Sequence, residues 1–268
     1  NNQYYKLYEP EGTESDPYLI VTVADLNALA DRVNAGAPCT GKYFTLVNDL
    51  VYDNSSANYV PVGNDSDNPF DATFDGQGHT ISGIVMDATT TNQGLFGVID
   101  ANGMVKNLTL ADSRFNDLRY LGGIAVHNYG KVVNCHVKSS VTCTFDDYLF
   151  QVGGIIGYNH DTGLVAGCTA AADLNASGSG SSSDIGGVVG FNQGQVKDCL
   201  FYGTSVQGGT KNYGAIVGND SSDENAMDNN FHTSLSVKAI GASTAGEPSY
   251  NLAGKAEYAE TWDFLPPG

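Results

Sequence analysis

Acidic side chains are the residues of this sequence with the most evident chemical potential. Clustered carboxylates suit calcium, and two carboxylates facing one groove suit glycoside hydrolysis. Two groups lie close together along the chain: Asp65, Asp67, Asp71 and Asp75, and Asp220, Asp223, Glu224 and Asp228. Neither group has the alternating ligands and central glycine of an EF-hand loop. We therefore interpret both as solvated acidic loops, place Asp75 at a structural corner, and predict no metal-binding residue.

The histidines, serines and basic residues carry no other signature of catalysis. His79, His127, His136, His160 and His232 show no HExxH spacing, and no GxSxG elbow occurs. Basic residues are sparse, and Lys106, Lys131 and Lys197 recur at equivalent repeat positions, which indicates an exposed polar face. We predict no catalytic residue and no cofactor, and favour a protein that is not an enzyme.

The cysteines form neither a disulfide framework nor a zinc motif, because their number is odd and no CxxC pair occurs. Cys135, Cys168 and Cys199 fall at one position of a repeat, with Leu108 at the same position one repeat earlier. Apolar neighbours on both sides predict that this column faces inward, where a free cysteine acts as a small hydrophobic residue.

That repeat is the main organising feature of the chain. Segments of one kind begin at residues 94, 123, 154, 187 and 215, so their starts are 29, 31, 33 and 28 residues apart. They are Gly94-Leu95-Phe96-Gly97, Gly123-Ile124-Ala125-Val126, Gly154-Ile155-Ile156-Gly157, Gly187-Val188-Val189-Gly190 and Ala215-Ile216-Val217-Gly218. Repeats of this length indicate units that must stack on their neighbours to bury an apolar face.

Short apolar runs punctuated by Gly and Asn predict strands, and one repeat per rung implies three short strands with three corners. We predict an all-β, right-handed parallel β-helix forming one domain over residues 1–268. Residues 1–42 form a lead-in and an N-terminal helix cap, residues 43–237 the solenoid rungs, and residues 238–268 an irregular C-terminal cap. The capping-box pattern of Thr22 and Asp25 predicts a helix from Thr22 to Gly36. The Gly/Ser-rich stretch from Asn175 to Asp184 is expected to be a loop.

Two further columns follow each glycine-flanked strand. Asn128, Asn159 and Asn192, with Asp220 weakly equivalent, predict a structural ladder in which side-chain amides bond between rungs. His127, Tyr158 and Phe191 precede this ladder. If these rings project outward they form an aromatic stripe suited to stacking on sugars, and if inward they belong to the core. Both orientations are open from sequence, and these three residues are our candidate ligand-binding site.

Composition limits the possible partners. The formal net charge of −18 offers no basic stripe for phosphates, so we expect no nucleic acid partner and no attraction to anionic membranes. No stretch approaches the roughly 20 apolar residues of a spanning helix, so we predict no membrane insertion. Because the chain starts at Asn1 without an apolar leader, we interpret it as a mature or trimmed form.

The block from Phe74 to Ile81, followed by Gly94 to Gly97 and the repeated Gly153–Gly157 and Gly186–Gly190 units with Cys168 and Cys199, resembles GLUG-motif proteins. The resemblance covers most of residues 18–237 and implies a secreted or surface-exposed bacterial β-solenoid. It implies no family-wide catalytic residue.

We therefore expect a non-enzymatic extracellular or cell-surface module for binding or adhesion, with a glycan or a host surface protein as partner. The alternatives are a carbohydrate-active β-helix enzyme, either a polysaccharide lyase or a glycoside hydrolase, and a passive spacer for another domain. The oligomeric state is not indicated by the sequence.

Overall fold

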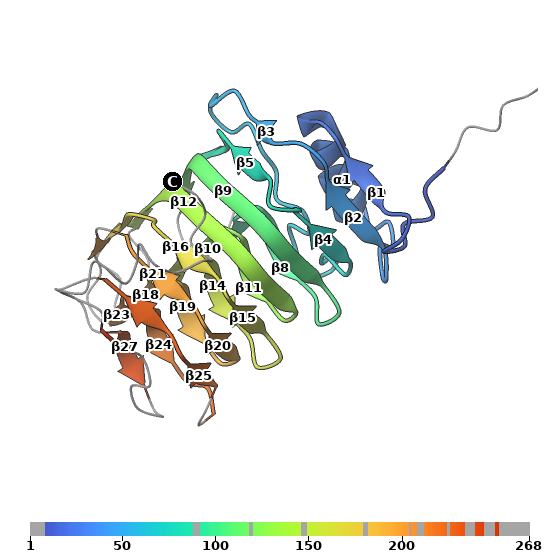
Figure 1. The fold of residues 1–268 in the computed structure, drawn as a ribbon. Helices are drawn as coiled ribbons and strands as arrows, with labels where there is room; N and C mark the ends of the chain where they lie inside the picture. Colours follow the sequence, from blue (N-terminus) through green and yellow to red (C-terminus); the bar gives the residue numbers. More distant parts are fainter. Residues whose placement is uncertain are drawn as a thin grey trace, which may run out of the picture.

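The computed structural model shows an all-β solenoid in which the chain coils around a continuous apolar core (Figure 1). It describes residues 9–87, 92–117, 120–145, 149–178, 182–203, 205–207, 212–223, 226–233, 239–243 and 250–251. Strands of successive rungs pair in parallel and form three sheets. The predicted parallel β-helix is confirmed.

Sheet 1 is the largest, with 17 strands among the described residues, and it contributes several consecutive segments to each rung. Its strands before the first long one are β1 (Tyr18–Ile20), β2 (Tyr43–Leu46), β3 (Leu50–Val51), β4 (Thr73–Asp75), β5 (Thr80–Ser82) and β6 (Val85–Asp87). The central strands are β9 (Met104–Asp117), β12 (Lys131–Phe145), β15 (Leu164–Ala166), β16 (Thr169–Ala170) and β17 (Leu174–Gly178). The last are β20 (Gln195–Lys197), β21 (Leu200–Phe201), β22 (Val206–Gln207), β25 (Met227–Asp228), β26 (Phe231–His232) and β28 (Tyr250–Asn251).

Two smaller sheets complete each rung. In the described ranges sheet 2 consists of β8 (Phe96–Ile99), β11 (Ala125–Asn128), β14 (Ile156–Asn159), β19 (Val189–Asn192), β24 (Val217–Asp220) and β27 (Ile240–Ser243). Over the same ranges sheet 3 consists of β7 (Asn92–Gln93), β10 (Tyr120–Gly122), β13 (Leu149–Gly153), β18 (Ser182–Gly186) and β23 (Asn212–Gly214). A rung passes from sheet 3 to sheet 2 and then to sheet 1.

The repeated glycine segment marks the bend between sheet 3 and sheet 2. A Cβ atom placed on Gly123 would lie 2.5 Å from the carbonyl oxygen of Gly154 on the next rung. Gly154 stands in the same relation to Gly187. Glycine recurs at this position in four of the five segments because the two backbones approach closely, and the fifth segment has only the methyl group of Ala215 there.

The predicted cysteine column lies inside the solenoid. Cys135, Cys168 and Cys199 are fully buried, and Cys135 is in register with Leu108. Cys143 lies on β12, and its side chain is outside the described part of the structure. Inward orientation of the column is therefore confirmed.

The predicted helix forms as α1 (Val23–Asn34), the only helix among the described residues. Thr22 and Asp25 make the reciprocal capping-box contacts, and Gly36 follows the helix at φ 79°. Its buried face consists of Leu26, Leu29, Ala30 and Val33, which join the core beside β1. None of the described helical structure is long and apolar enough to cross a membrane.

Stacking continues past residue 237, because β27 pairs with β24 and β28 pairs with β26. Each added strand satisfies backbone groups that the preceding rung would otherwise leave unpaired. The rest of the expected C-terminal cap, residues 238, 244–249 and 252–268, lies outside the described residues.

One local prediction was wrong. Most of the Gly/Ser-rich stretch from Asn175 to Asp184 is strand, since β17 ends at Gly178 and β18 begins at Ser182. Asn175 pairs in register with Thr142 on one neighbouring rung and with Gln207 on the other. Backbone pairing on both sides overrides the low intrinsic strand preference of this sequence.

Candidate functional site

Strands β11, β14, β19 and β24 of sheet 2 each end in one member of a buried polar ladder. Asn128, Asn159 and Asn192 are fully buried, and each donates from its side-chain amide to the next member at 2.8 Å. Asn192 donates to Oδ1 of Asp220, which also accepts from the hydroxyl of Ser222 at 2.7 Å. The predicted ladder is confirmed, and Asp220 is its terminal acceptor.

The residues just before the ladder form an aromatic column on the opposite side of the strands. His127 pairs with Tyr158, and Tyr158 with Phe191, so the three lie at one position on successive rungs. Asn128 reaches toward the carbonyl of Leu164 in sheet 1, whereas the His127 ring contacts Tyr120 of sheet 3 at 5.4 Å. All three rings are half-buried. The outward orientation is therefore the one observed.

A second column, directly after the asparagines, completes the ring cluster. Tyr129 and His160 occupy equivalent places on successive rungs. The backbone N–H of Tyr129 donates to the carbonyl of Ile99 on the preceding rung, and that of His160 donates to the carbonyl of Asn128 in the same way. The His160 ring lies between two tyrosine rings, stacked on Tyr129 and on Tyr158 with centroids 3.7 Å apart in each case. Phe191 meets Tyr158 edge to face at 4.9 Å. We call Tyr120, His127, Tyr129, Tyr158, His160 and Phe191 the aromatic surface.

Hydrogen bonds fix the rings of this surface. Nδ1 of His127 and Nε2 of His160 are 3.2 Å apart, so one ring donates and the other accepts. The hydroxyl of Tyr158 donates to Oε1 of Gln193 at 2.6 Å. Rings held in this way lose little conformational entropy when a ligand packs on them.

Burial sets the protonation state of the two histidines. It lowers the pKa of His127 to about 4, and burial together with the nearby His127 lowers the pKa of His160 to about 4. Both rings are therefore neutral near pH 7. The aromatic surface presents rings and hydroxyl groups without a positive charge.

Sequence reasoning found half of the aromatic surface. His127, Tyr158 and Phe191 are brought together as predicted, whereas Tyr120, Tyr129 and His160 were not assigned. The repeat gives a signal for Tyr129 and His160, since each follows a ladder asparagine. Tyr120 belongs to another sheet, and only the close approach of sheets 2 and 3 shows it as a member.

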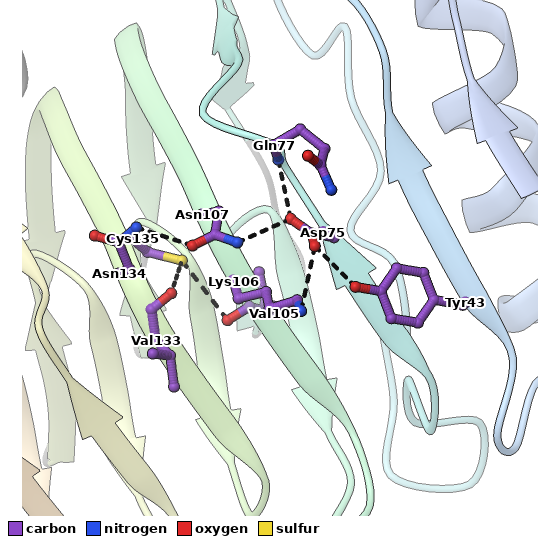
Figure 2. Close-up of polar contacts among 9 residues, drawn as sticks. All are labelled: Tyr43, Asp75, Gln77, Val105, Lys106, Asn107, Val133, Asn134 and Cys135. Atoms are coloured by element: carbon purple, nitrogen blue, oxygen red, sulfur yellow. Dashed lines mark hydrogen bonds and ion pairs between the residues drawn. The ribbon is translucent and has the colours of Figure 1, made fainter. Parts of the chain in front are cut away.

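Asp75 holds a second polar cluster, which is structural (Figure 2). Its carboxylate accepts from Tyr43 at 2.8 Å and from Asn107 at 3.0 Å, and it pairs with Lys106 at 3.2 Å. The backbone N–H of Gln77 donates to the same carboxylate. Although burial opposes ionisation, these donors hold the pKa of Asp75 below its ordinary value. All its oxygens are engaged, so Asp75 stabilises the corner.

The other acidic residues do not form a common site. Asp65 accepts from the backbone N–H groups of Asp67 and Asn68, and Asp71 accepts from the hydroxyl of Thr40. Asp220 ends the asparagine ladder. Within the described ranges, no three His, Cys, Asp or Glu side chains are placed to hold a metal ion. Glu224 lies outside those ranges.

The lysine pattern needs one correction. On successive rungs Lys106 pairs with Val133, Val133 with Ala166, and Ala166 with Lys197. Lys106 and Lys197 therefore share a column. Lys131 instead pairs with Met104, two positions earlier in the strand. Lys131 directly follows Gly130, whereas Lys106 and Lys197 stand three residues after Gly103 and Gly194, so the spacing in the sequence itself separates Lys131 from the other two.

These features define a parallel β-solenoid with an internal asparagine ladder and an aromatic surface beside it. Residues 148–175 match the family model described as the GLUG motif, so the chain carries this motif and the resemblance noted from its sequence is confirmed.

Two curated proteins share sequence with the chain. It is 31% identical over 159 residues to "Halomucin" of Haloquadratum walsbyi, an alignment that covers 56% of the chain and 2% of that protein. It is 33% identical over 136 residues to a "Putative Gly-rich membrane protein" of Evansella cellulosilytica, covering 48% of the chain and 15% of that protein. The chain thus matches only a small part of each relative, and their names point to a surface or extracellular setting.

A solved structure shares the fold. The crystal structure of a "putative immunoglobulin A1 protease" from Bacteroides ovatus superimposes with a TM-score of 0.70, covering 91% of this chain and 77% of that one. Sequence identity over this superposition is 19%, so the likeness concerns the fold alone.

Proposed function

We propose that this chain is an extracellular or cell-surface binding module of a bacterium, and that the aromatic surface is where it contacts a glycan. One observation supports this proposal most directly. Six rings from three rungs and two sheets gather at one place, and five of the contacts between them have centroid distances of 5.4 Å or less.

The chemistry of the surface favours a carbohydrate. Tyrosine and phenylalanine rings offer flat apolar faces with a polar edge, which suit the alternating C–H faces and hydroxyl groups of a pyranose. Tyr129 stacks on His160 with one face of its half-buried ring. Its second face and the ring of Phe191 are the places where a sugar would stack. The Tyr158 hydroxyl and the Gln193 amide lie beside them to form hydrogen bonds.

The names of the sequence relatives support the setting. One is named "Halomucin" and the other "Putative Gly-rich membrane protein", and each is aligned with about half of this chain. An acidic surface with a net charge of −18 keeps such a module dispersed near other charged polymers.

Binding to a glycan array and to immobilised mucin tests the proposal. We expect the protein to bind at least one neutral glycan, and expect Tyr129→Ala and Phe191→Ala each to weaken that binding at least tenfold. Tyr213→Ala is the matched control, because Tyr213 is 45% exposed on sheet 3 and is not part of the aromatic surface. Absence of binding to every glycan and to mucin, by a folded protein, would favour the spacer role instead.

A further inference from the structure

A polar groove crosses the outer face of sheet 1, away from the aromatic surface, with which it shares no residue. Its cavity volume is about 400 Å³, and its lining includes Asp112, Ser113, Arg114, Lys138, Ala171 and Asp173. Sites for small ligands usually fall in the range of roughly 300–1,000 Å³. The lining has no aromatic ring, so the groove suits a small hydrophilic ligand.

A β-bulge shapes the groove. Ala111 pairs with Lys138 and Arg114 pairs with Ser140, so two residues of β9, Asp112 and Ser113, face a single residue of β12. Asp112 adopts φ 46°, in the left-handed region. Bulges re-aim side chains and occur often beside functional sites. Here the bulge leaves both Asp112 and Arg114 exposed on the outer face.

The floor of the groove is rigid. Ser113 is buried, accepts from the N–H of Ile84 at 3.2 Å and donates to the carbonyl of Ala111 at 2.8 Å. Ser139, also buried, donates to the carbonyl of Leu110. On the following rung the residue facing outward is Ala171, whose small side chain leaves room above the floor. The hollow is thus built into the stacked rungs.

The charges in the groove identify the class of ligand. Arg114 and Lys138 approach it from neighbouring rungs, and neither forms an ion pair within the described part of the chain. They are two of only 12 basic residues in a chain with 30 acidic ones. A guanidinium binds a carboxylate through two parallel hydrogen bonds. Asp112 adds an acceptor for a hydroxyl group at the same groove.

We propose that this groove binds a small carboxylated sugar. The sugar carboxylate lies against Arg114 and Lys138, and a ring hydroxyl donates to Asp112. This site goes beyond the proposed function, since it is separate in place and in ligand chemistry from the aromatic surface.

Isothermal titration of the 268-residue protein with glucuronate tests the proposal, with glucose and acetate as matched probes. Glucose keeps the ring hydroxyls without the carboxylate, and acetate keeps the carboxylate without the hydroxyls. We expect glucuronate to bind at least tenfold more tightly than either. Equal affinity for acetate would identify a simple anion site, and equal affinity for glucose a simple polyol site; both would overturn the proposal.

Substitutions locate the site. We expect Arg114→Gln and Lys138→Gln each to weaken glucuronate binding at least tenfold, and Asp112→Asn to weaken glucuronate but not acetate. Lys131→Gln is the control, because Lys131 is exposed on the same sheet but does not line the groove. If the Arg114→Gln variant does not fold, the affinity of the Lys138→Gln variant for glucuronate tests the assignment. Unchanged affinity in the folded variants would overturn the assignment, whereas Tyr129→Ala and Phe191→Ala should leave glucuronate binding intact.

Discussion

The side-chain amide of Asn159 donates to Oδ1 of Asn192 at 2.8 Å, inside the solenoid and one rung away. The same amide lies 3.3 Å from the carbonyls of Gly163 and Gln195, and its own Oδ1 accepts from Asn128. Asn159 therefore connects three rungs through one side chain. A buried polar group is tolerated here because nearly all its hydrogen-bonding capacity is used.

Replacement of Asn159 should be costly. Asn159→Ala leaves the amide of Asn128 and Oδ1 of Asn192 without their partners, at about 1–3 kcal/mol for each unsatisfied group. We expect unfolding at a clearly lower urea concentration, with the midpoint of the transition measured by circular dichroism. Gln195→Ala, on the exposed side of β20, should stay within about 0.5 kcal/mol of the unmodified protein. Equal midpoints for the two variants would show that the ladder does not stabilise the fold.

The left-handed backbone conformation of the corner residues of sheet 1 leads to a separate prediction about stability. Asn107, Asn134 and Asp198 adopt φ between 52° and 55°, and Gly167 takes φ 62° at the same place on its rung. Asn134→Val forces a β-branched residue into this region, at about 1–2 kcal/mol, whereas Asn134→Gly avoids that strain. Both variants lose the hydrogen bond to Asn107. The difference in their unfolding free energies therefore isolates the backbone effect, and no difference would contradict it.

The buried cysteines should resist modification. Cys39, Cys135, Cys168 and Cys199 are all buried and free, and burial raises the pKa of Cys135 and Cys199. Since the thiolate is the reactive form, we expect no reaction with a thiol reagent in the native protein. The assay uses Cys143→Ser, so that only these four thiols are counted. All four should react in urea. A rapidly reacting thiol in the native state would argue against the inward column.

The paired histidines should make stability depend on pH. His127 and His160 have pKa values of about 4 in the folded protein and 6.5 as the ordinary value. The unfolded chain therefore binds more protons between these limits, and stability should fall as the pH drops from 6.5 toward 4. His160→Phe keeps a ring between the two tyrosines but removes one titrating group. We expect a flatter profile of melting temperature for this variant, and an unchanged slope would exclude the histidine pair as its cause.

The architecture was predictable because similar segments recur every 28 to 33 residues along the chain. The cysteine column and the asparagine ladder follow directly from alignment of the glycine segments, since in-register stacking places equivalent residues together. The placement of Lys131 was wrong although the sequence contradicts it, since Lys131 stands one residue after Gly130 and Lys106 stands three residues after Gly103. The strands β17 and β18 were missed because pairing with both neighbours, not local preference, makes them strands.

The sites were less predictable than the fold. The repeat indicates that His127, Tyr158 and Phe191 share a column, but their direction depends on which way the neighbouring asparagines point, since successive residues of a strand face opposite sides. The groove was not foreseen, since Asp112 and Arg114 converge with Lys138 only through a bulge between two long strands. Such irregularities interrupt the repeat, and an argument from periodicity does not detect them.

The matching environments of successive rungs have a consequence for how this protein can evolve. Removal of residues 154–186 would join Gly153 to Gly187 and place Asn192 on the rung after Asn128. The side-chain hydrogen bonds of the asparagine ladder would then run directly from Asn128 to Asn192. Recombination between repeats in the gene can therefore lengthen or shorten the molecule in whole coils. The length of the solenoid can therefore change while the internal contacts of each remaining rung are conserved.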